Sequence, residues 1–213
     1  MKKILALVLL MAIVLVTGCG GGNKTPNDTT ADGKDKPIGK ILVVYFSRTG
    51  ETHGNNITKG NTAIVADIIA QKTGGDIFEI KPVNPYPNEY EACVEVAKRE
   101  LEVNARPEFV GNVENFAQYD MIFVGYPIWL SSVPRVVLTF LENNDFNGKK
   151  VVPFCTHGGS GLGSTPNEIT RACRGAAILD GFDIIGTGVQ QDKSQTESIV
   201  VKNLKRLDID VAE

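Results

Sequence analysis

Hydroxyl, amide and glycine residues gather in a turn between a strand pattern and a helix pattern early in the chain. Residues 41–46 form an almost unbroken apolar and β-branched run, which favours a strand covered on both faces. Residues 63–70 then place apolar side chains at helical spacing. The polar residues of the turn between them are Ser47, Thr49, Gly50, Gly60, Asn61 and Thr62. Because a helix N-terminus offers backbone N–H groups and the positive end of the helix dipole, this turn predicts a phosphate site.

A polar insert at residues 51–60 separates the two halves of this turn, and its composition indicates an excursion over the surface. The insert contains His53, and a lone histidine in a polar loop is more often solvated than catalytic. We therefore expect Ser47, Asn61 and Thr62, rather than the insert, to contact the phosphate.

Two further loops carry residues that core packing does not require. Residues 127–132 follow a nearly all-apolar strand pattern at 120–126 and include Trp129, which either stacks on a flat ligand or caps the core. Residues 156–163 follow a strand pattern at 150–156 and are rich in glycine, which lets the backbone approach a ligand or a neighbouring turn closely. Together with the phosphate turn, these loops predict a phosphorylated planar heterocycle as the ligand.

Strand and helix patterns alternate along the rest of the domain. Residues 81–87 contain three prolines and are not expected to form regular structure. Further strands are expected at 76–80 and, with an uncertain boundary, at 176–179 and 183–186; helices are expected at 89–104, 133–143, from about 165, and at 194–207. This alternation predicts right-handed βαβ units and a doubly wound α/β parallel sheet, in which ligands bind at the carboxyl ends of the strands.

Four motifs, YFSRTG, GNT, GYPIW and THGGSGLG, together resemble the flavodoxin-like family, and the resemblance covers residues 40 to about 207. It implies a flavodoxin-like five-stranded parallel sheet in the order 2-1-3-4-5, with helices on both faces. It also implies FMN as the cofactor, bound where the winding direction of the sheet reverses.

The resemblance also implies which residues would hold FMN. Around the phosphate they would be Ser47, Arg48, Thr49, Asn61, Thr62 and Ala63. Along the ring and ribityl chain they would be Pro127, Ile128, Trp129 and Leu130, and at the pyrimidine edge Thr156, His157, Gly158, Gly159 and Gly163. Leu130 stands where many relatives continue with a second tryptophan or with Gly-Thr, so the face of the flavin would be more open here. No catalytic side chain and no metal site are expected.

The resemblance implies an FMN-binding electron-transfer protein, with an unknown redox partner protein or a small-molecule acceptor. The alternative is an NAD(P)H-dependent quinone or nitro reductase, although the chain shows no second nucleotide-binding unit. Whether the protein is itself an enzyme therefore stays open. A non-catalytic lipoprotein that has lost its flavin is a further alternative.

A serine hydrolase is the last alternative, because residues 157–160, HGGS, resemble an oxyanion-hole segment beside a serine. A nucleophile elbow requires Gly-x-Ser-x-Gly, and Leu162 occupies the second glycine position around Ser160. The two histidines, His53 and His157, have no evident aspartate partner in the sequence.

The N-terminal residues resemble the leader of a bacterial lipoprotein. Residues 1–18 carry two lysines and then an apolar run, as in a secretory signal peptide, and Cys19 follows a lipobox-like Leu-Val-Thr-Gly. Residues 19–39 then form a lipidated cysteine and a flexible polar tether, before one FMN-binding domain at residues 40–213. We therefore expect an exported protein, anchored through Cys19 on the outer side of the cytoplasmic membrane.

Composition excludes other classes of function. The formal net charge is −3 and no basic cluster with interleaved aromatic residues occurs, so nucleic-acid binding is not expected. Cys93, Cys155 and Cys173 have no CxxC spacing, which argues against a zinc knuckle or a disulfide framework. We expect three small, buried or half-buried side chains.

Overall fold

The computed structural model describes residues 39–52 and 55–212 of the chain. The predicted signal peptide at residues 1–18, the anchor Cys19, the tether up to residue 38, and His53 lie outside the described residues.

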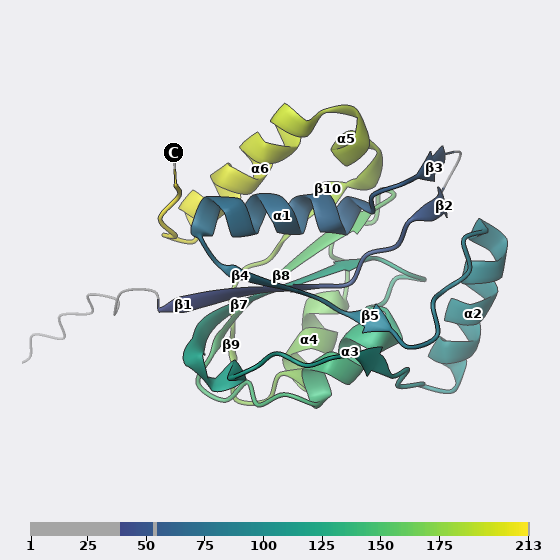
Figure 1. The fold of residues 1–213 in the computed structure, drawn as a ribbon, viewed down its shortest axis with the longest axis horizontal. Helices are drawn as coiled ribbons and strands as arrows, with labels where there is room; N and C mark the ends of the chain where they lie inside the picture. The colour runs from purple at the N-terminus through teal and green to yellow at the C-terminus, as the bar shows by residue number, and fades with distance from the viewer. Residues whose placement is uncertain (1–38, 53–54, 213) are drawn as a thin grey trace, which may run out of the picture. The chain divides into compact units, whose positions relative to one another are not determined.

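A parallel sheet forms the middle layer of the domain, in the order β10-β8-β7-β1-β4 (Figure 1). Its members are β1 (Lys40–Tyr45), β4 (Asp76–Glu79), β7 (Tyr119–Pro127), β8 (Lys150–His157) and β10 (Phe182–Ile185). Counted in chain order along this sheet, the strands have the predicted order 2-1-3-4-5, so the predicted fold class is confirmed.

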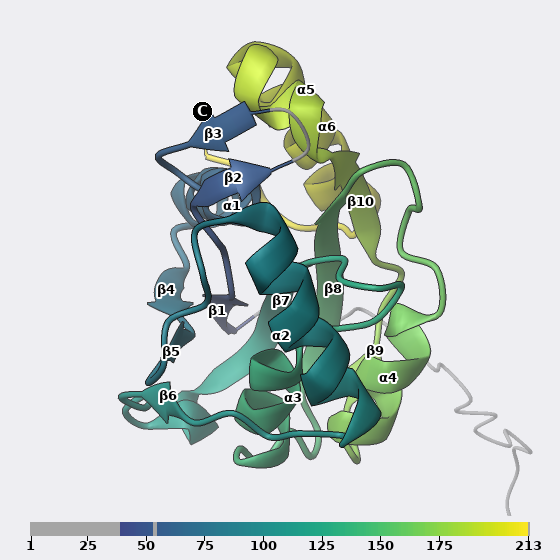
Figure 2. The same ribbon diagram turned by 90° about the vertical axis from the view of Figure 1, so that its right-hand side faces the viewer.

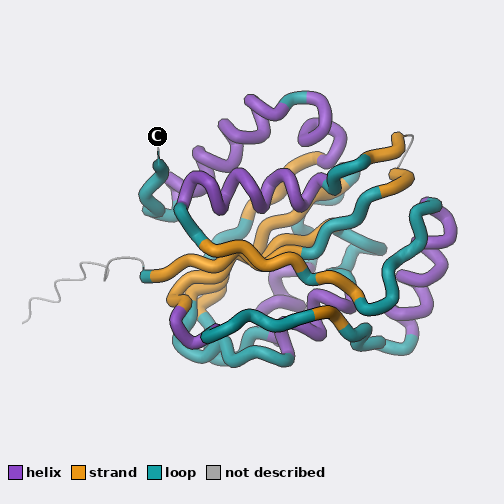
Figure 3. Tube along the Cα trace, viewed as in Figure 1, coloured by secondary structure: helices purple, strands orange, loops and turns teal. Residues whose placement is uncertain are grey.

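Helices cover both faces of the sheet, as the ribbon and tube views show (Figures 1 and 3). One face carries α1 (Asn61–Thr73), α5 (Gly186–Gln191) and α6 (Lys193–Arg206), and the other carries α3 (Arg135–Glu142) and α4 (Thr165–Ala172). Because strands β1, β7 and β8 are covered on both faces, their side chains are almost entirely apolar and buried. A short 3₁₀ turn, η1 (Phe116–Gln118), precedes β7.

The carboxyl ends of the strands are surrounded by elements that belong to neither helical layer (Figure 2). The polar insert folds into an antiparallel hairpin of β2 (Gly50–Thr52) and β3 (Asn55–Ile57). Helix α2 (Tyr90–Glu102) stands beside this hairpin and buries only Cys93 and Ala97. These elements form the walls around the end of the sheet where a ligand is expected.

Two expectations about regular structure were wrong. The proline-rich segment does contain a strand, β5 (Lys81–Pro82), which pairs with β6 (Phe109–Val110). A proline can stand there because this two-stranded ribbon has free edges that need no N–H donor. The short helix α5 was not predicted, since its sequence GTGVQQ contains two glycines and has low helix propensity.

The expected fifth strand is divided into two pieces. Strand β9 (Ala177–Ile178) pairs with the beginning of β8, and β10 pairs with its end. Both pieces lie along the same edge of β8, so the division leaves the predicted topology unchanged.

Cys93, Cys155 and Cys173 are buried, as expected, and are free thiols. Burial raises the pKa of Cys155 and of Cys173 to about 12, so both remain neutral thiols at physiological pH.

Within residues 39–52 and 55–212, no cluster of histidine, cysteine and acidic side chains is suited to a metal ion. No helix in that part of the chain is long and apolar enough to cross a bilayer.

Gly125 gives a test of how tightly the sheet packs. A Cβ atom at this position of β7 would lie 2.1 Å from the Phe154 ring, which is itself stacked on Phe182. We predict that Gly125→Ala lowers the free energy of unfolding by about 1–3 kcal/mol, measured by chemical denaturation, because the buried ring has no room to move. Gly188→Ala in α5 is the matched control, since its Cβ would meet open space; an equal loss there would contradict the packing argument.

Candidate functional site

A pocket of about 460 Å³ opens at the carboxyl ends of β1, β7 and β8. It collects residues from all three loops that the sequence singled out. Of the predicted binding residues, the lining contains Ser47, Arg48, Asn61, Thr62, Pro127, Ile128, Trp129, Leu130, Thr156, His157 and Gly158. Thr49, Ala63, Gly159 and Gly163 lie outside the lining.

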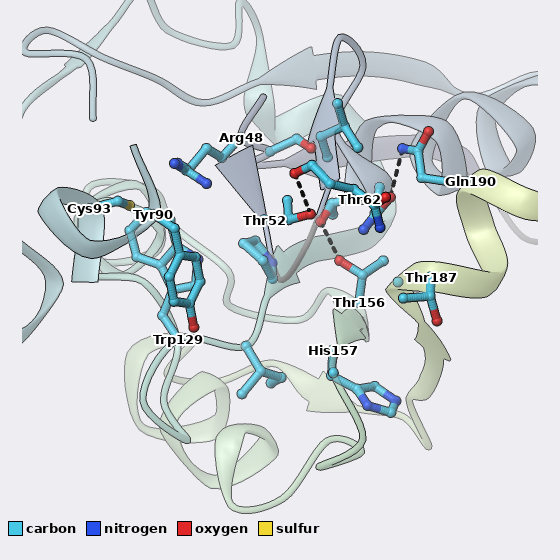
Figure 4. Close-up of a pocket in the computed structure, with 18 of the residues that line it drawn as sticks. Arg48, Thr52, Thr62, Tyr90, Cys93, Trp129, Thr156, His157, Thr187 and Gln190 are labelled. Atoms are coloured by element: carbon cyan, nitrogen blue, oxygen red, sulfur yellow. Dashed lines mark hydrogen bonds between the residues drawn. The ribbon is translucent and has the colours of Figure 1, made fainter. Parts of the chain in front are cut away.

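Hydroxyl groups and the N-terminus of α1 make one end of the pocket polar (Figure 4). The Thr62 and Thr156 hydroxyl oxygens lie 2.8 Å apart, and both side chains are buried. The first hydrogen bond within α1 runs from the Ile64 N–H to the Gly60 carbonyl, so the Asn61 and Thr62 N–H groups precede the helical ladder. The arrangement presents amide and hydroxyl donors together, which is the donor set that a phosphate requires.

The Ala63 amide is committed to a contact within the protein. Its N–H donates to the Ser47 hydroxyl at 3.1 Å, which joins the turn after β1 to the first turn of α1. The predicted phosphate contact of Ala63 therefore has no support in the structure, and Asn61 and Thr62 are the better-placed amides.

Arg48 supplies the charge of the pocket, because no lysine, aspartate or glutamate lines it among the described residues. Its guanidinium donates to three backbone carbonyls, those of Pro87, Glu51 and Asn88. Arg48 thus ties the β2–β3 hairpin to the loop before α2. The predicted phosphate role and this bracing role are compatible, since a guanidinium carries five N–H donors.

Trp129 both packs on the core and faces the pocket. Its ring makes edge-to-face contacts with Phe46 and Tyr86, at centroid distances of 5.3 and 4.8 Å. It also belongs to the pocket lining, at the apolar end opposite Thr62 (Figure 4). The two alternatives for this tryptophan are therefore not exclusive, because its aromatic neighbours fix the ring that forms the pocket wall.

The turn that carries Trp129 has an unusual backbone. Trp129 and Ser132 exchange two backbone hydrogen bonds of 3.1 and 2.9 Å, and the two residues between them have positive φ, 50° at Leu130 and 61° at Ser131. Two-residue turns of this kind normally use Asn-Gly, because other side chains are strained in the left-handed region. The site therefore holds a strained turn next to its aromatic wall.

His157 has a partner that the sequence did not reveal. Its Nε2 lies 2.8 Å from a carboxylate oxygen of Asp183 on β10, and its Nδ1 accepts a hydrogen bond from the Gly159 N–H. The expectation that no aspartate faces this histidine was wrong, because the pair joins strands distant in the chain. It does not form a hydrolase triad, since the Ser160 hydroxyl is exposed and donates to the Gly161 carbonyl instead.

Three groups of lining residues were not predicted from the sequence. Helix α2 contributes Tyr90, Cys93, Val94 and Ala97; helix α5 contributes Gly186, Thr187, Gln190 and Gln191; and the hairpin contributes Thr52, Asn55, Asn56 and Ile57. The lining residues of α2 lie at helical spacing in the sequence, but that spacing does not show which surface the helix faces. Gln190 carried no signal, although its amide donates to Asn61 and to the Lys59 carbonyl and so ties α5 to the start of α1.

Known proteins resemble this chain over its described part. Residues 40–196 match the family model for flavodoxin. A candidate flavoprotein from Bacteroides eggerthii is 30% identical with a TM-score of 0.62, and the match covers 80% of this chain and 99% of that one. A second, from Bacteroides uniformis, is 31% identical with a TM-score of 0.60, covering 72% and 96%.

A more distant structure shares the fold. The flavoprotein from Lactobacillus acidophilus in complex with FMN is 19% identical with a TM-score of 0.53, and the match covers 72% of this chain and 97% of that one. No curated protein matches the chain.

The strain in the Trp129–Ser132 turn can be measured. We predict that Ser131→Gly raises the free energy of unfolding by roughly 0.5–1 kcal/mol, because glycine adopts positive φ without the steric cost paid by other residues. Ser160→Gly is the matched control, since Ser160 is equally exposed but has no positive φ. Chemical denaturation of both variants tests the idea; a gain in both, or in neither, would argue against strain at residue 131.

Proposed function

Because this chain belongs to the flavodoxin family, we propose that its pocket holds FMN and that the protein carries electrons between partners. The observation that carries the proposal is the pairing, in one pocket, of a polar helix N-terminus with an aromatic wall. A phosphorylated planar heterocycle requires both features, and FMN supplies one- and two-electron redox chemistry when it is bound.

The residues present fit the proposed cofactor. Thr62 and Thr156 offer hydroxyls, and the α1 N-terminus offers amides, at the end where a phosphate would be bound. Arg48 adds positive charge to the pocket, which favours an anionic ligand. Trp129 offers a flat apolar wall against which the ring would lie, and Gly158 lines the pocket without a side chain.

The chain's own contribution to electron transfer is to bind and shield rather than to react. No acidic side chain lines the pocket among the described residues, and the lining cysteine, Cys93, is a buried thiol whose pKa is raised by burial. The His157 ring is held between Asp183 and the Gly159 amide. These features supply no activated nucleophile, which favours an electron carrier over a hydrolase.

One observation favours a second candidate, an NAD(P)H-dependent quinone or nitro reductase. The apolar side of α2, with Tyr90, Val94 and Ala97, faces the pocket beside Leu130 and could receive an apolar acceptor. Steady-state oxidation of NADPH by the FMN-loaded protein with a quinone separates the two candidates. A carrier shows negligible turnover unless a reductase protein is added.

The membrane anchor is a proposal that the N-terminal sequence supports. Cys19 follows the lipobox-like Leu-Val-Thr-Gly, and the polar residues after it have the composition of a linker. We propose that lipid on Cys19 keeps the protein on the outer side of the cytoplasmic membrane, where it would meet a membrane-bound redox partner.

Replacing Cys19 tests the anchor directly. We predict that Cys19→Ser in the full-length chain, expressed in a bacterial host, moves the protein from the membrane fraction to the soluble fraction, because serine cannot take the thioether-linked lipid. Asn23→Ser, a change within the tether, should stay with the membrane. Mass spectrometry of the mature N-terminus gives an independent reading, and an unlipidated wild-type Cys19 would refute the anchor.

Replacing Thr62 tests the phosphate end of the pocket. We predict that Thr62→Val weakens FMN binding roughly tenfold or more, since hydrogen bonds to charged groups contribute about 1.5–3 kcal/mol. Titration of the apoprotein with FMN, followed by flavin fluorescence, measures the dissociation constant.

Thr139→Val is the control for this titration. Thr139 is also buried, but its hydroxyl bonds the Arg135 carbonyl within α3, away from the pocket. Unchanged affinity in Thr62→Val would place the phosphate elsewhere, and a wild-type protein that binds no FMN would overturn the proposed function itself.

A further inference from the structure

We propose that Glu168 is a positioning residue for the flavin, because its carboxylate holds the strained Trp129–Ser132 turn in the shape that presents Trp129 to the pocket. The inference rests on the proposed function, in which the FMN ring lies against Trp129. It assigns a role to a side chain on α4 that is not itself in the pocket lining.

The turn needs an external support. Leu130 and Ser131 both have positive φ, and neither is glycine or asparagine, so the local sequence does not favour this conformation. Two backbone hydrogen bonds between Trp129 and Ser132 close the turn, but Leu130 is 42% exposed and contributes little packing to hold it. A conformation of this kind persists only where surrounding structure fixes it.

The carboxylate of Glu168 supplies that support at the last residue of the turn. One oxygen accepts from the Ser132 hydroxyl at 2.8 Å, and the other lies 3.4 Å from the Val133 N–H. The same carboxylate accepts from Arg135 at 2.8 Å, and Arg135 also donates to the Ser132 hydroxyl and to the Val133 carbonyl at 3.1 Å. Ser132 is thus held between a carboxylate and a guanidinium.

Arg135 is buried and Glu168 is largely buried, which makes their geometry specific. The side chains of Arg135 and Glu168 are 8% and 14% exposed, and Nε of Arg135 is buried without a hydrogen-bond partner. A buried ion pair adds little net stability over well-packed apolar residues, because desolvation of both charges opposes their attraction. The Arg135–Glu168 pair leaves one guanidinium donor without a partner. We therefore attribute its role to the turn conformation that it fixes rather than to added stability.

The position of Glu168 also connects two walls of the pocket. It lies on α4, directly after the glycine-rich loop, and the first residue of α4, Thr165, bonds both Tyr126 on β7 and the Leu162 carbonyl of that loop. The turn after β7 and the loop after β8 are thus fixed to the same helix. A change at Glu168 should alter the Trp129 wall without touching the phosphate end of the pocket.

The chain offers a direct probe of this wall, because Trp129 is its single tryptophan. In the full-length apoprotein, Glu168→Gln should increase acrylamide quenching of the Trp129 emission. Glu168→Gln should also raise the dissociation constant for FMN about tenfold, in line with the loss of charge-assisted hydrogen bonds. Glu142→Gln is the matched control, since Glu142 pairs with Arg106 at the other end of α3 and should change neither reading.

A rescue experiment separates positioning from general stability. The double variant Leu130→Asn/Ser131→Gly installs a turn sequence that adopts positive φ by itself. In this background, Glu168→Gln should have a much smaller effect on quenching and on FMN affinity than in the wild type. If Glu168→Gln does not fold, Ser132→Ala replaces it in the same cycle, because it removes the hydroxyl that links the turn to the carboxylate.

The outcomes are distinct. Unchanged quenching and affinity in Glu168→Gln, or equal losses in the wild-type and Asn-Gly backgrounds, would overturn the positioning role. A wild-type protein that binds no FMN would instead overturn the proposed function, and the quenching of the apoprotein would still decide whether Glu168 holds the turn.

Discussion

The close contact between the start of α1 and the turn after β1 is the constraint on which the site depends. A Cβ atom on Gly60 would lie 2.1 Å from the Ser47 hydroxyl and 2.5 Å from the Arg48 carbonyl, so only glycine allows the helix to begin there. The contact directs the first amides of α1 toward the carboxyl ends of the sheet. It also leaves the Ser47 hydroxyl to accept from the Ala63 N–H, which satisfies one free donor of the first turn where the N-cap residue, Gly60, has no side chain to do so.

The same edge of the sheet explains why elements distant in sequence share one pocket. Strands β1, β7 and β8 are neighbours and parallel, so their following loops emerge side by side. Different hydrogen bonds hold each loop. Arg48 donates to three backbone carbonyls, Glu168 and Arg135 both bond Ser132, and His157 bonds Asp183. Arg48 and His157 belong to the lining themselves, whereas Glu168, Arg135 and Asp183 act on its shape from outside it.

Much of the site could be read from the sequence, because its main loops directly follow strands with strong apolar patterns. Ser47 and Trp129 lie two residues after the ends of β1 and β7, Thr156 lies near the end of β8, and Thr62 opens the helix pattern that follows the insert; all four line the pocket. The α2 wall and Gln190 could not be assigned in this way. The apolar side of a helix does not show which surface it will cover, and a glutamine side chain gives no local indication of its partner. The partner of His157 was missed for the same reason, because Asp183 comes from another strand.

The sequence by itself determined the order of strands and helices, the phosphate turn and the resemblance to flavodoxins, because periodicity and turn residues act over short distances along the chain. Only the tertiary structure decided that Leu130 and Ser131 adopt positive φ and that Glu168 supports them. Local preference opposes that backbone, so it exists only because α3 and α4 bring a buried guanidinium and a largely buried carboxylate to Ser132. Long-range packing, rather than local pattern, thus sets the shape of the aromatic wall.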